Sequence, residues 1–300
     1  MSVLFGLVKR NVKMFFKDKG LFFTSLVTPL ILLVLYATFL SNVYRDSFLA
    51  ALPSGFTLPD DLVGGLVGGQ LFSSLLAVCP ITVAFCSNML MVQDKINGAR
   101  RDMLVSPLKQ SILSLSYFFA TFISTLVICV VAVIACFIYL AFTGWYFTFG
   151  GVCLIFLDVL LLTLFGTALS SFVNQFLSSQ GQVSAVGTIV SSCYGFICGA
   201  YMPLSSFSAG LQSVLSYVPF TYATSLLRNH CLSGVFAEMR AVGLPNSAVD
   251  GLMTSVDCNI SFNGTLVGQP VMYVVLGVSI LLFLSLFVVV GAKSARASKK

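Results

Sequence analysis

Long apolar stretches alternate with short polar segments along the whole chain. Six stretches are long enough to cross a bilayer, which takes about 20 mostly apolar residues in a helix. They run approximately from Leu21 to Val43, Leu66 to Val92, Ile112 to Phe142, Val152 to Val173, Val183 to Met202 and Val271 to Gly291. Because these stretches are continuously apolar rather than alternating, they predict helices and not the strands of a β-barrel. The pattern therefore predicts an all-α polytopic membrane protein with six transmembrane helices.

Two of these boundaries fall inside longer uncharged intervals. The interval from Lys109 to Asp158 is too long for one crossing, and turn residues meet interface aromatics at Thr143-Gly144-Trp145-Tyr146. The interval from Asp158 to Arg228 is broken by the uncharged polar run 174–182. We expect each interval to hold two spans.

The composition supports a membrane location. Hydrophobic residues make up 58% of the chain and charged residues 9%, whereas soluble domains carry about 25% charged residues. These values exclude a soluble enzyme, an intrinsically disordered chain and a disulfide-stapled secreted domain.

The basic residues orient the predicted spans. With six crossings, most of them lie on one side: Lys9, Arg10, Lys13, Lys17, Lys19, Lys95, Arg100, Arg101, Lys109, Lys293, Arg296, Lys299 and Lys300. Because basic residues concentrate in cytoplasmic segments, both termini are expected in the cytoplasm of a multi-pass protein of the plasma (cell inner) membrane. The net charge of +6 reflects this asymmetry, and no nucleic-acid partner is expected.

Residues 1–20 predict an amphipathic helix. Its apolar arc and its basic arc consist, respectively, of Leu4, Val8, Val12, Phe15 and Phe16, and of Lys9, Arg10, Lys13 and Lys17. Such a helix is expected to lie in the inner headgroup layer, contacting membrane lipid. The alternative is a polybasic flank that only anchors the topology. The remainder, 21–300, is expected to form the six-span domain.

The cytoplasmic segment 93–109 is the only intracellular loop with charges. Asn97-Gly98 predicts a break after the second span, and Ala99 to Val105 has the length of two helical turns before Pro107. A short charged helix in this position suits docking to a soluble partner. A solvated connector is the alternative.

The outer region 203–269 is long for a connection. Its first half, Leu204 to Leu232, is moderately apolar and is predicted to form two short re-entrant helices, which membranes tolerate only where protein or a water-filled cavity satisfies the backbone. Its second half, Ser233 to Gln269, is polar and predicts an exposed cap.

Searches for catalytic or metal-binding patterns find nothing. The sequence lacks a Gly-Lys pair, and therefore a phosphate-binding loop, and it has one histidine, His230. Neither an enzyme nor a bound cofactor or metal is expected. Seven of the nine cysteines lie in predicted spans, while Cys231 and Cys258 lie outside them, where a disulfide is possible in an oxidising compartment but is not required.

Asp158 is the only charged residue inside a predicted span. Placing a carboxylate there costs roughly 2.5–3.5 kcal/mol on insertion scales, so a compensating partner or cavity is expected. Structural hydrogen bonding and a place in a substrate path remain open as its role.

The motifs as a set resemble permease subunits of type-2 ABC exporters, in the branch that exports drugs and antibiotics. The resemblance rests on three groups in order: Leu7-Val8-Lys9-Arg10-Asn11, Phe16-Lys17-Asp18-Lys19-Gly20 and Thr28-Pro29; then Asp94-Lys95-Ile96-Asn97-Gly98 and Leu104-Val105-Ser106-Pro107; then Ser216 to Ala223 and Leu227-Arg228. Gln93 and Ile96 depart from the usual acidic positions of the middle group, so charge pairing with an ATPase could rest on Asp94 and Asp102.

The resemblance implies a half-transporter. Two permease copies, identical or paralogous, would form the pathway, and two cytosolic ABC ATPase subunits holding ATP and Mg would drive it. The N-terminal helix would act as a connecting helix through Lys9, Arg10, Lys13 and Lys17. ATPase coupling would involve Asp94, Lys95, Asn97, Gly98, Arg100, Arg101, Asp102, Leu104 and Ser106. Pro219, Tyr222 and Arg228 would belong to the re-entrant region.

Two other functions are compatible with the residues. One is an ion-coupled secondary carrier or channel that uses Asp158, and the other is a non-transporting membrane immunity or assembly protein. An exporter of an amphipathic drug, antibiotic or lipid-like substrate remains the principal hypothesis.

Overall fold

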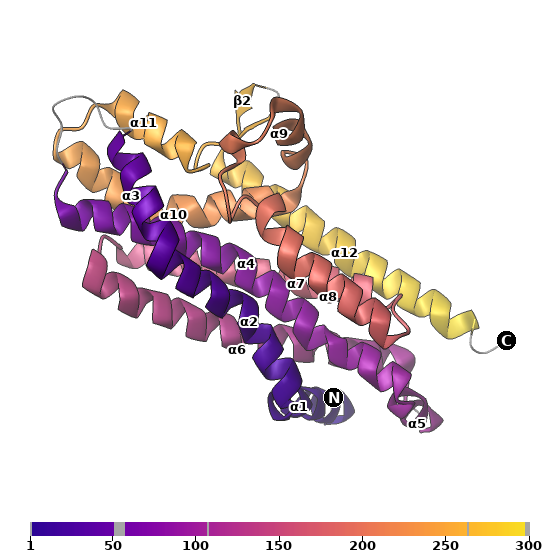
Figure 1. Ribbon diagram of the computed structural model, residues 1–300. Helices are drawn as coiled ribbons and strands as arrows, with labels where there is room; N and C mark the ends of the chain where they lie inside the picture. Colours follow the sequence, from indigo (N-terminus) through magenta and orange to yellow (C-terminus); the bar gives the residue numbers. More distant parts are fainter. Residues whose placement is uncertain (1, 51–57, 107, 263, 298–300) are drawn as a thin grey trace.

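A computed structural model describes residues 2–50, 58–106, 108–262 and 264–297. It is a bundle of long helices with a small cap at one end (Figure 1). The elements are α1 (Ser2–Lys17), α2 (Lys19–Leu35), the π-helical turn η1 (Tyr36–Leu40), α3 (Ser41–Ala50), α4 (Asp60–Ile96), α5 (Ala99–Val105), α6 (Gln110–Thr143), α7 (Phe149–Asn174), α8 (Gln180–Ile197), η2 (Leu204–Ser206), α9 (Ala209–Leu215), α10 (Pro219–Ala241), α11 (Asn246–Ser255), the antiparallel strands β1 (Ser261–Phe262) and β2 (Thr265–Leu266), and α12 (Gln269–Ala297).

The all-α polytopic fold is confirmed. In the described ranges, five helical stretches are long and apolar enough to span a membrane: Lys19–Ala50, Asp60–Ile96, Gln110–Thr143, Phe149–Asn174 and Gln269–Gly291. The first is longer than predicted because α2, η1 and α3 form one continuous helix. The expected break between the third and fourth spans is present, since α6 ends at Thr143 and α7 begins at Phe149.

The remaining predicted span, Val183 to Met202, corresponds to α8. This helix has 18 residues and ends at Ile197, so it is about 27 Å long at 1.5 Å per residue, and its Gln, Ser and Thr residues keep it out of the five apolar stretches. Figure 1 nevertheless shows α1, α5 and the C-terminal end of α12 at the same end of the bundle. Because only an even number of crossings returns the chain to its starting end, α8 crosses the bundle as well.

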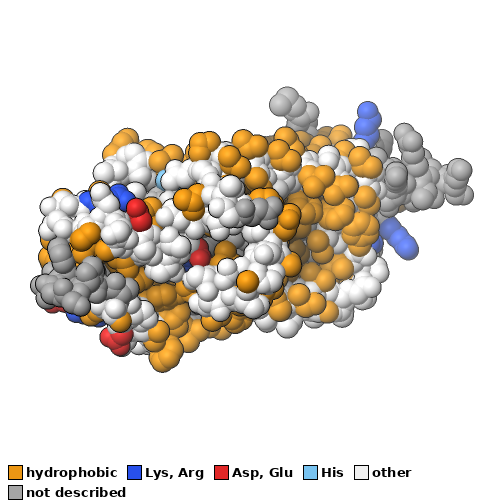
Figure 2. Space-filling model, turned by 90° about the horizontal axis from the view of Figure 1, so that it is seen from above, with side chains coloured by type: hydrophobic (Ala, Val, Ile, Leu, Met, Phe, Trp, Pro, Cys, Tyr) orange, Lys and Arg blue, Asp and Glu red, His pale blue; other side chains and the backbone are white. Residues whose placement is uncertain are grey.

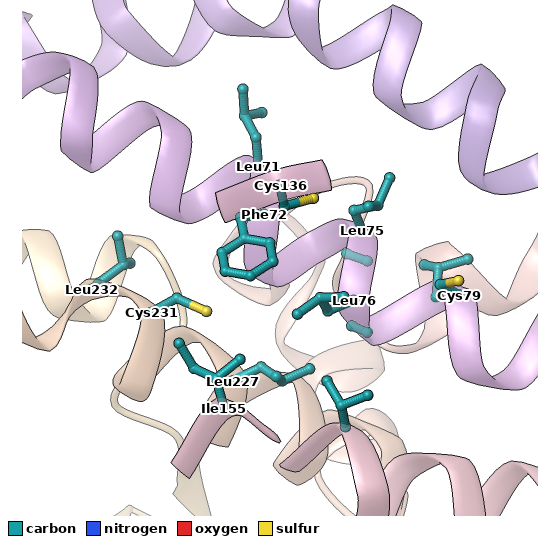
Figure 3. Packing of buried hydrophobic residues seen from close by; sticks show 14 of the residues in the cluster. Leu71, Phe72, Leu75, Leu76, Cys79, Cys136, Ile155, Leu227, Cys231 and Leu232 are labelled. Carbon is teal, nitrogen blue, oxygen red and sulfur yellow. The ribbon is translucent and has the colours of Figure 1, made fainter. Parts of the chain in front are cut away.

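The core lies around α4, which packs against α2, α6, α7, α8 and α10. Figure 3 shows the meeting point, where side chains of four helices converge: Leu71, Phe72, Leu75, Leu76 and Cys79 of α4, Cys136 of α6, Ile155 of α7, and Leu227, Cys231 and Leu232 of α10. On the face in Figure 2, apolar side chains gather to the right of the middle and along the lower edge, backbone and other side chains cover much of the remainder, and the lysines and arginines lie toward the ends. This distribution fits a bilayer around the middle of the bundle.

The outer region differs from its prediction. Instead of two short helices within Leu204 to Leu232, α9 has 7 residues and α10 has 23 residues and continues to Ala241. Val235, Phe236 and Met239 are buried, so the first part of the segment predicted as an exposed cap belongs to a buried helix. The cap itself consists of α11 and the β1–β2 hairpin.

Contacts with α7 show how deeply α10 enters the bundle. The rings of Phe220 and Phe165 lie 5.5 Å apart between centroids, and His230 contacts Asp158. The two helices are therefore antiparallel. Phe165 follows the start of α7 by 16 residues, or about 24 Å along its axis, so α10 begins deep in the bundle and runs outward, as a re-entrant segment does.

The outer half of α10 depends on a close approach at Gly234. A Cβ at this position would collide with the carbonyl oxygen of Tyr146, in the link between α6 and α7. We predict that Gly234→Ala lowers the melting temperature of the purified protein, because overpacking typically costs about 1–3 kcal/mol. Gly251→Ala in α11 is the control, because a Cβ there meets no atom within 4 Å and the change is expected to be neutral or slightly stabilising. Equal melting temperatures for the two variants would contradict this packing.

Candidate functional site

The short charged helix expected after the second span is present. It is α5, Ala99–Val105, and it follows Gly98, whose φ of 83° lies in the left-handed region that favours glycine. Asn97 ends α4, as predicted. Figure 1 shows α5 at the same end of the bundle as α1.

The two sides of α5 face different surroundings. Met103 and Leu104 pack on the bundle, against the cluster formed by Met91, Leu113 and Tyr117. Leu104, expected to contribute to coupling, thus contacts its own chain. Val105 is 87% exposed, so its apolar side chain faces solvent, which the sequence alone did not indicate.

The polar residues of α5 lie beside Val105 and differ in their exposure. Arg101 and Asp102 are exposed and Arg100 is half-buried. The Ser106 hydroxyl donates a hydrogen bond to the carbonyl of Met103 at 2.6 Å, so it closes the end of α5. The outward surface of α5 therefore offers one apolar side chain beside charges of both signs.

Asp94, by contrast, does not face outward. It is 4% exposed and accepts hydrogen bonds from Arg10 Nη1 and from the Tyr117 hydroxyl, both at 2.6 Å. In this arrangement the partners of Asp94 come from α1 and α6, and its pairing with an ATPase stays a prediction. Asp94 instead joins α1 to the inner end of α4.

Lys95 is also turned toward its own chain. Its Nζ donates to the carbonyl of Leu177 at 2.8 Å and lies 3.4 Å from that of Gln175. These carbonyls directly follow α7, where a cation interacts favourably with the negative end of the helix dipole. The inner ends of α4 and α7 are thereby connected.

Helix α1 packs mainly through the predicted apolar arc, since Leu4, Val8 and Val12 are half-buried and Phe15 is buried, whereas Phe16 is exposed. Asn11 and Phe15 are its buried residues, and the Asn11 amide donates to Ser116 Oγ of α6 at 3.3 Å. Arg10 leaves the basic arc to pair with Asp94, and this hydrogen bond raises the pKa of Arg10 above its usual value. The exposed cations of the arc are Lys9, Lys13 and Lys17.

A groove lies between α2 and α8. Its inner part is a cavity of about 570 Å³, whose lining includes Thr28 and Leu32 of α2, Tyr36 of η1, and Ser191, Ser192 and Phe196 of α8. A second cavity of about 430 Å³ continues outward and shares Leu40 and Tyr201 with the first. The exposed face of α8 also carries Ser184 and Thr188, so this helix presents hydroxyl groups outward where a lipid-facing helix presents apolar ones.

The sequence profile described as ABC-2 family transporter protein matches residues 57–291. This range covers more than half of the chain. The chain belongs to the ABC-2 transporter family. No curated protein matches the chain significantly.

Family membership makes the chain a membrane-embedded transport subunit of an ABC transporter, a family whose permeases work with ABC ATPase subunits. It is consistent with the multi-pass bundle of apolar helices. The matched range includes α5 and the re-entrant helix α10, whereas α1 and α2 precede it.

In this transporter subunit, Asp158 is satisfied by two neighbours. Its Oδ2 lies 2.6 Å from His230 Nδ1 of α10, and its Oδ1 accepts a hydrogen bond from the Tyr273 hydroxyl of α12 at 2.7 Å. Asp158 is 1% exposed. Both carboxylate oxygens are therefore occupied, which favours structural hydrogen bonding over a place in a substrate path.

Arg228 joins three parts of the outer half. Its side chain is fully buried; Nη1 pairs with Asp257 at 2.7 Å and Nη2 donates to the carbonyl of Gly199 at 2.5 Å. Asp257 also accepts from the backbone N–H of Leu204 at 2.7 Å. Arg228 thus holds α10, the end of α8 and the loop after α11 together.

The other two residues of the re-entrant region have local roles. Pro219 is the first residue of α10, a position where the missing N–H costs nothing. The Tyr222 hydroxyl donates to the carbonyl of Ser216 at 2.5 Å. Both shape the turn into α10.

Cys231 and Cys258 are free, buried thiols. The possible disulfide between them is therefore not formed. Burial raises the pKa of Cys258 to about 12, so this thiol stays protonated and unreactive at neutral pH. Within the described ranges, no group of three or more His, Cys, Asp or Glu residues could hold a metal ion.

The sequence analysis did not identify the hydrogen-bonding partners of the buried charged residues Asp94, Asp158 and Arg228. Tyr117, Tyr273 and Asp257 are separated from their partners by 23, 115 and 29 positions. A local pattern contains no sign of such pairs. The only available signal was the general expectation that a charge inside a membrane needs a partner.

The Arg10–Asp94 pair generates a prediction about stability. We expect Asp94→Ala and Arg10→Ala each to lower the melting temperature, and the double variant to lose less than the sum, because contacting residues couple by about 0.5–3 kcal/mol. Arg45 and Asp60 provide the control, since their side chains are 47% and 86% exposed and exposed pairs contribute little. A coupling energy no larger than that of the control pair would show that Arg10 does not hold α1 on α4.

Asp158→Asn tests the role of the buried carboxylate. We predict a loss of stability of about 1–3 kcal/mol, because His230 and Tyr273 lose a charged acceptor, with no change in the ion dependence of transport. Asp250→Asn, at an exposed carboxylate, is expected to leave stability unchanged. Transport that runs on an ion gradient without ATP, and stops in Asp158→Asn, would instead support the carrier hypothesis.

Proposed function

We propose that this chain is the permease subunit of an ATP-driven ABC exporter. It moves an amphipathic drug, antibiotic or lipid-like substrate out of the cytoplasm or inner leaflet. Two cytosolic ABC ATPase subunits, which hold ATP and Mg, supply the energy. The observation that carries the proposal is the charged helix α5, projecting from the end of the bundle with Val105 exposed.

The docking surface consists of Val105, Arg101 and Asp102. An exposed apolar side chain surrounded by charges of both signs is typical of a protein interface, where an apolar anchor is buried and the polar rim provides specificity. A connector that only spans two helices needs no exposed valine in this position. Docking to an ATPase therefore explains α5 better than a solvated loop does.

Coupling to the pathway follows from what α5 is attached to. It directly follows α4, and α4 packs against α2 and α8, which form the groove. The Arg10–Asp94 pair adds α1 to the same unit. If nucleotide binds two conformations of the complex with different affinity, it shifts the equilibrium between them. A movement of α5 that accompanies this shift would then reach the groove.

A second copy of the permease accounts for the face of α8. Its outward hydroxyls at Ser184, Thr188 and Ser192 gain nothing from lipid tails, and polar side chains in a membrane usually face a protein or a water-filled cavity. Two copies that meet through α2 and α8 would enclose the grooves between them. The pathway then lies at the interface.

The orientation follows from the basic end of the bundle. Lys9, Lys13 and Lys17 are exposed on α1 and meet anionic headgroups of the inner leaflet of the plasma membrane, with both termini in the cytoplasm. The basic tail residues Lys293, Arg296, Lys299 and Lys300 support the same orientation by sequence; their side chains lie outside the described part.

The test is disruption of the docking surface. We predict that Val105→Asp and Arg101→Glu abolish copurification of the ABC ATPase that accompanies the wild-type chain, and with it substrate-stimulated ATP hydrolysis. Val105→Asp introduces a charge where an apolar contact is made, and Arg101→Glu introduces a negative charge where the partner meets a positive one. Lys109→Glu is the matched control, because Lys109 is exposed on the same end but lies outside α5. It is expected to retain assembly. An intact, active complex in both α5 variants would reject the docking assignment.

A further inference from the structure

The two cavities along α2 and α8 form one groove that no acidic or basic side chain of the described residues lines. They share Leu40 and Tyr201. Among the described residues that line them, none is Lys, Arg, His, Asp or Glu. The nearby Arg228 and Asp257 neutralise each other, so they leave no free charge for a ligand.

The inner and outer parts differ in character. The inner cavity is lined mainly by apolar side chains, including Val27, Ile31, Leu32, Leu35 and Phe196, with a few hydroxyls at Thr28, Ser191 and Ser192. The outer cavity adds the hydroxyls of Ser47, Ser205, Ser206 and Ser255. Hydrogen-bonding capacity therefore increases toward the outer end.

The junction between the two parts has a defined shape. The ring of Tyr201 occupies the space that Gly195 leaves without a side chain, and its hydroxyl donates to the carbonyl of Ser191 at 3.3 Å. Leu40, the last residue of η1, also lines both cavities. Single π-helical turns within α-helices occur frequently at functional sites, and η1 is such a turn at the junction of the two cavities.

We infer that this groove binds an uncharged amphipathic molecule, with its apolar body in the inner cavity and its hydrogen-bonding head group in the outer one. An unpaired charge in a low-dielectric site is penalised heavily, and the lining offers no counter-ion. Hydroxyl and backbone groups, by contrast, satisfy an uncharged polar head. That this molecule is the exported cargo rests on the proposed function.

Three probes with one apolar body test the charge preference: 1-pyrenebutanol, 1-pyrenebutylammonium and 1-pyrenebutyrate. Saturable binding to the chain in nanodiscs is measured above that of empty nanodiscs. The alcohol is expected to bind at least about tenfold more tightly than either ion, a difference of about 1.4 kcal/mol. Equal or tighter binding of either charged probe overturns the inference.

Substitutions on α8 locate the site. Ser192→Asp places a carboxylate in the inner cavity and is expected to shift the preference toward the ammonium probe by about tenfold. Ser213→Asp in α9 is the matched control, because Ser213 is exposed but lines neither cavity, and it should leave the preference unchanged. Ser192→Phe, which adds no charge, should weaken binding of the alcohol by filling the cavity. Identical behaviour of Ser192→Asp and Ser213→Asp, or full binding in Ser192→Phe, places the ligand elsewhere.

The same nanodiscs, prepared with the copurifying ATPase, separate the two proposals. If the complex assembles and hydrolyses ATP while the alcohol shows no preferential binding, the cargo inference fails and the proposed function stands. If no ATPase assembles while the alcohol binds in the groove, the proposed function fails and the groove remains a binding site for an uncharged amphipath. Stimulation of hydrolysis by the alcohol alone among the three probes is the result expected when both hold.

Discussion

A charge inside a membrane protein must be paired, and this constraint organises the bundle. The three buried carboxylates of the described chain, Asp94, Asp158 and Asp257, each contact a basic side chain from a distant segment: Arg10, His230 and Arg228. An unpaired carboxylate at such depth would cost several kcal/mol. The pairs therefore hold α1 to α4, α10 to α7 and the outer cap to α10, arrangements that apolar packing alone specifies weakly, since lipid and leucine are equally apolar.

These pairs also determine which charges remain available. The buried carboxylates are paired within the protomer. Arg101 and Asp102 of α5 and the exposed lysines of α1 therefore remain for contacts with other molecules. The groove between α2 and α8 is left with hydroxyl groups and apolar side chains. Charge recognition is thereby concentrated at the membrane surface, and hydrogen bonding is concentrated in the candidate pathway.

The sequence predicted the parts of the fold that depend on local pattern. Apolar length predicted the spans, and Gly98 predicted the start of α5, because backbone preference and hydropathy act over a few residues. The extent of α10 could not be predicted, since Glu238 and Arg240 make its last turns polar while Val235 and Phe236 are buried by contacts with other elements. Contacts with other elements also determine that Leu104 faces inward and Val105 outward. The seven residues of α5 are too few for their sequence pattern to predict this. The burial of Asp94 against Arg10 and Tyr117 could not be predicted, because these partners are remote in sequence.

Helix α4 connects the proposed docking surface on α5 to the groove between α2 and α8. Its inner end continues into α5, its sides contact α2 and α8, and it contains Pro80. Because proline lacks the backbone N–H, one hydrogen bond of the helix is missing there and bending is easier than elsewhere. A displacement of α5 can then reach the groove either by movement of α4 as a body or by bending at Pro80. Since Arg10 and Lys95 fasten α1 and the end of α7 to the inner part of α4, both routes move these segments together. In the proposed complex, the buried Arg10–Asp94 pair would determine which helices move with α5, in addition to stabilising the fold.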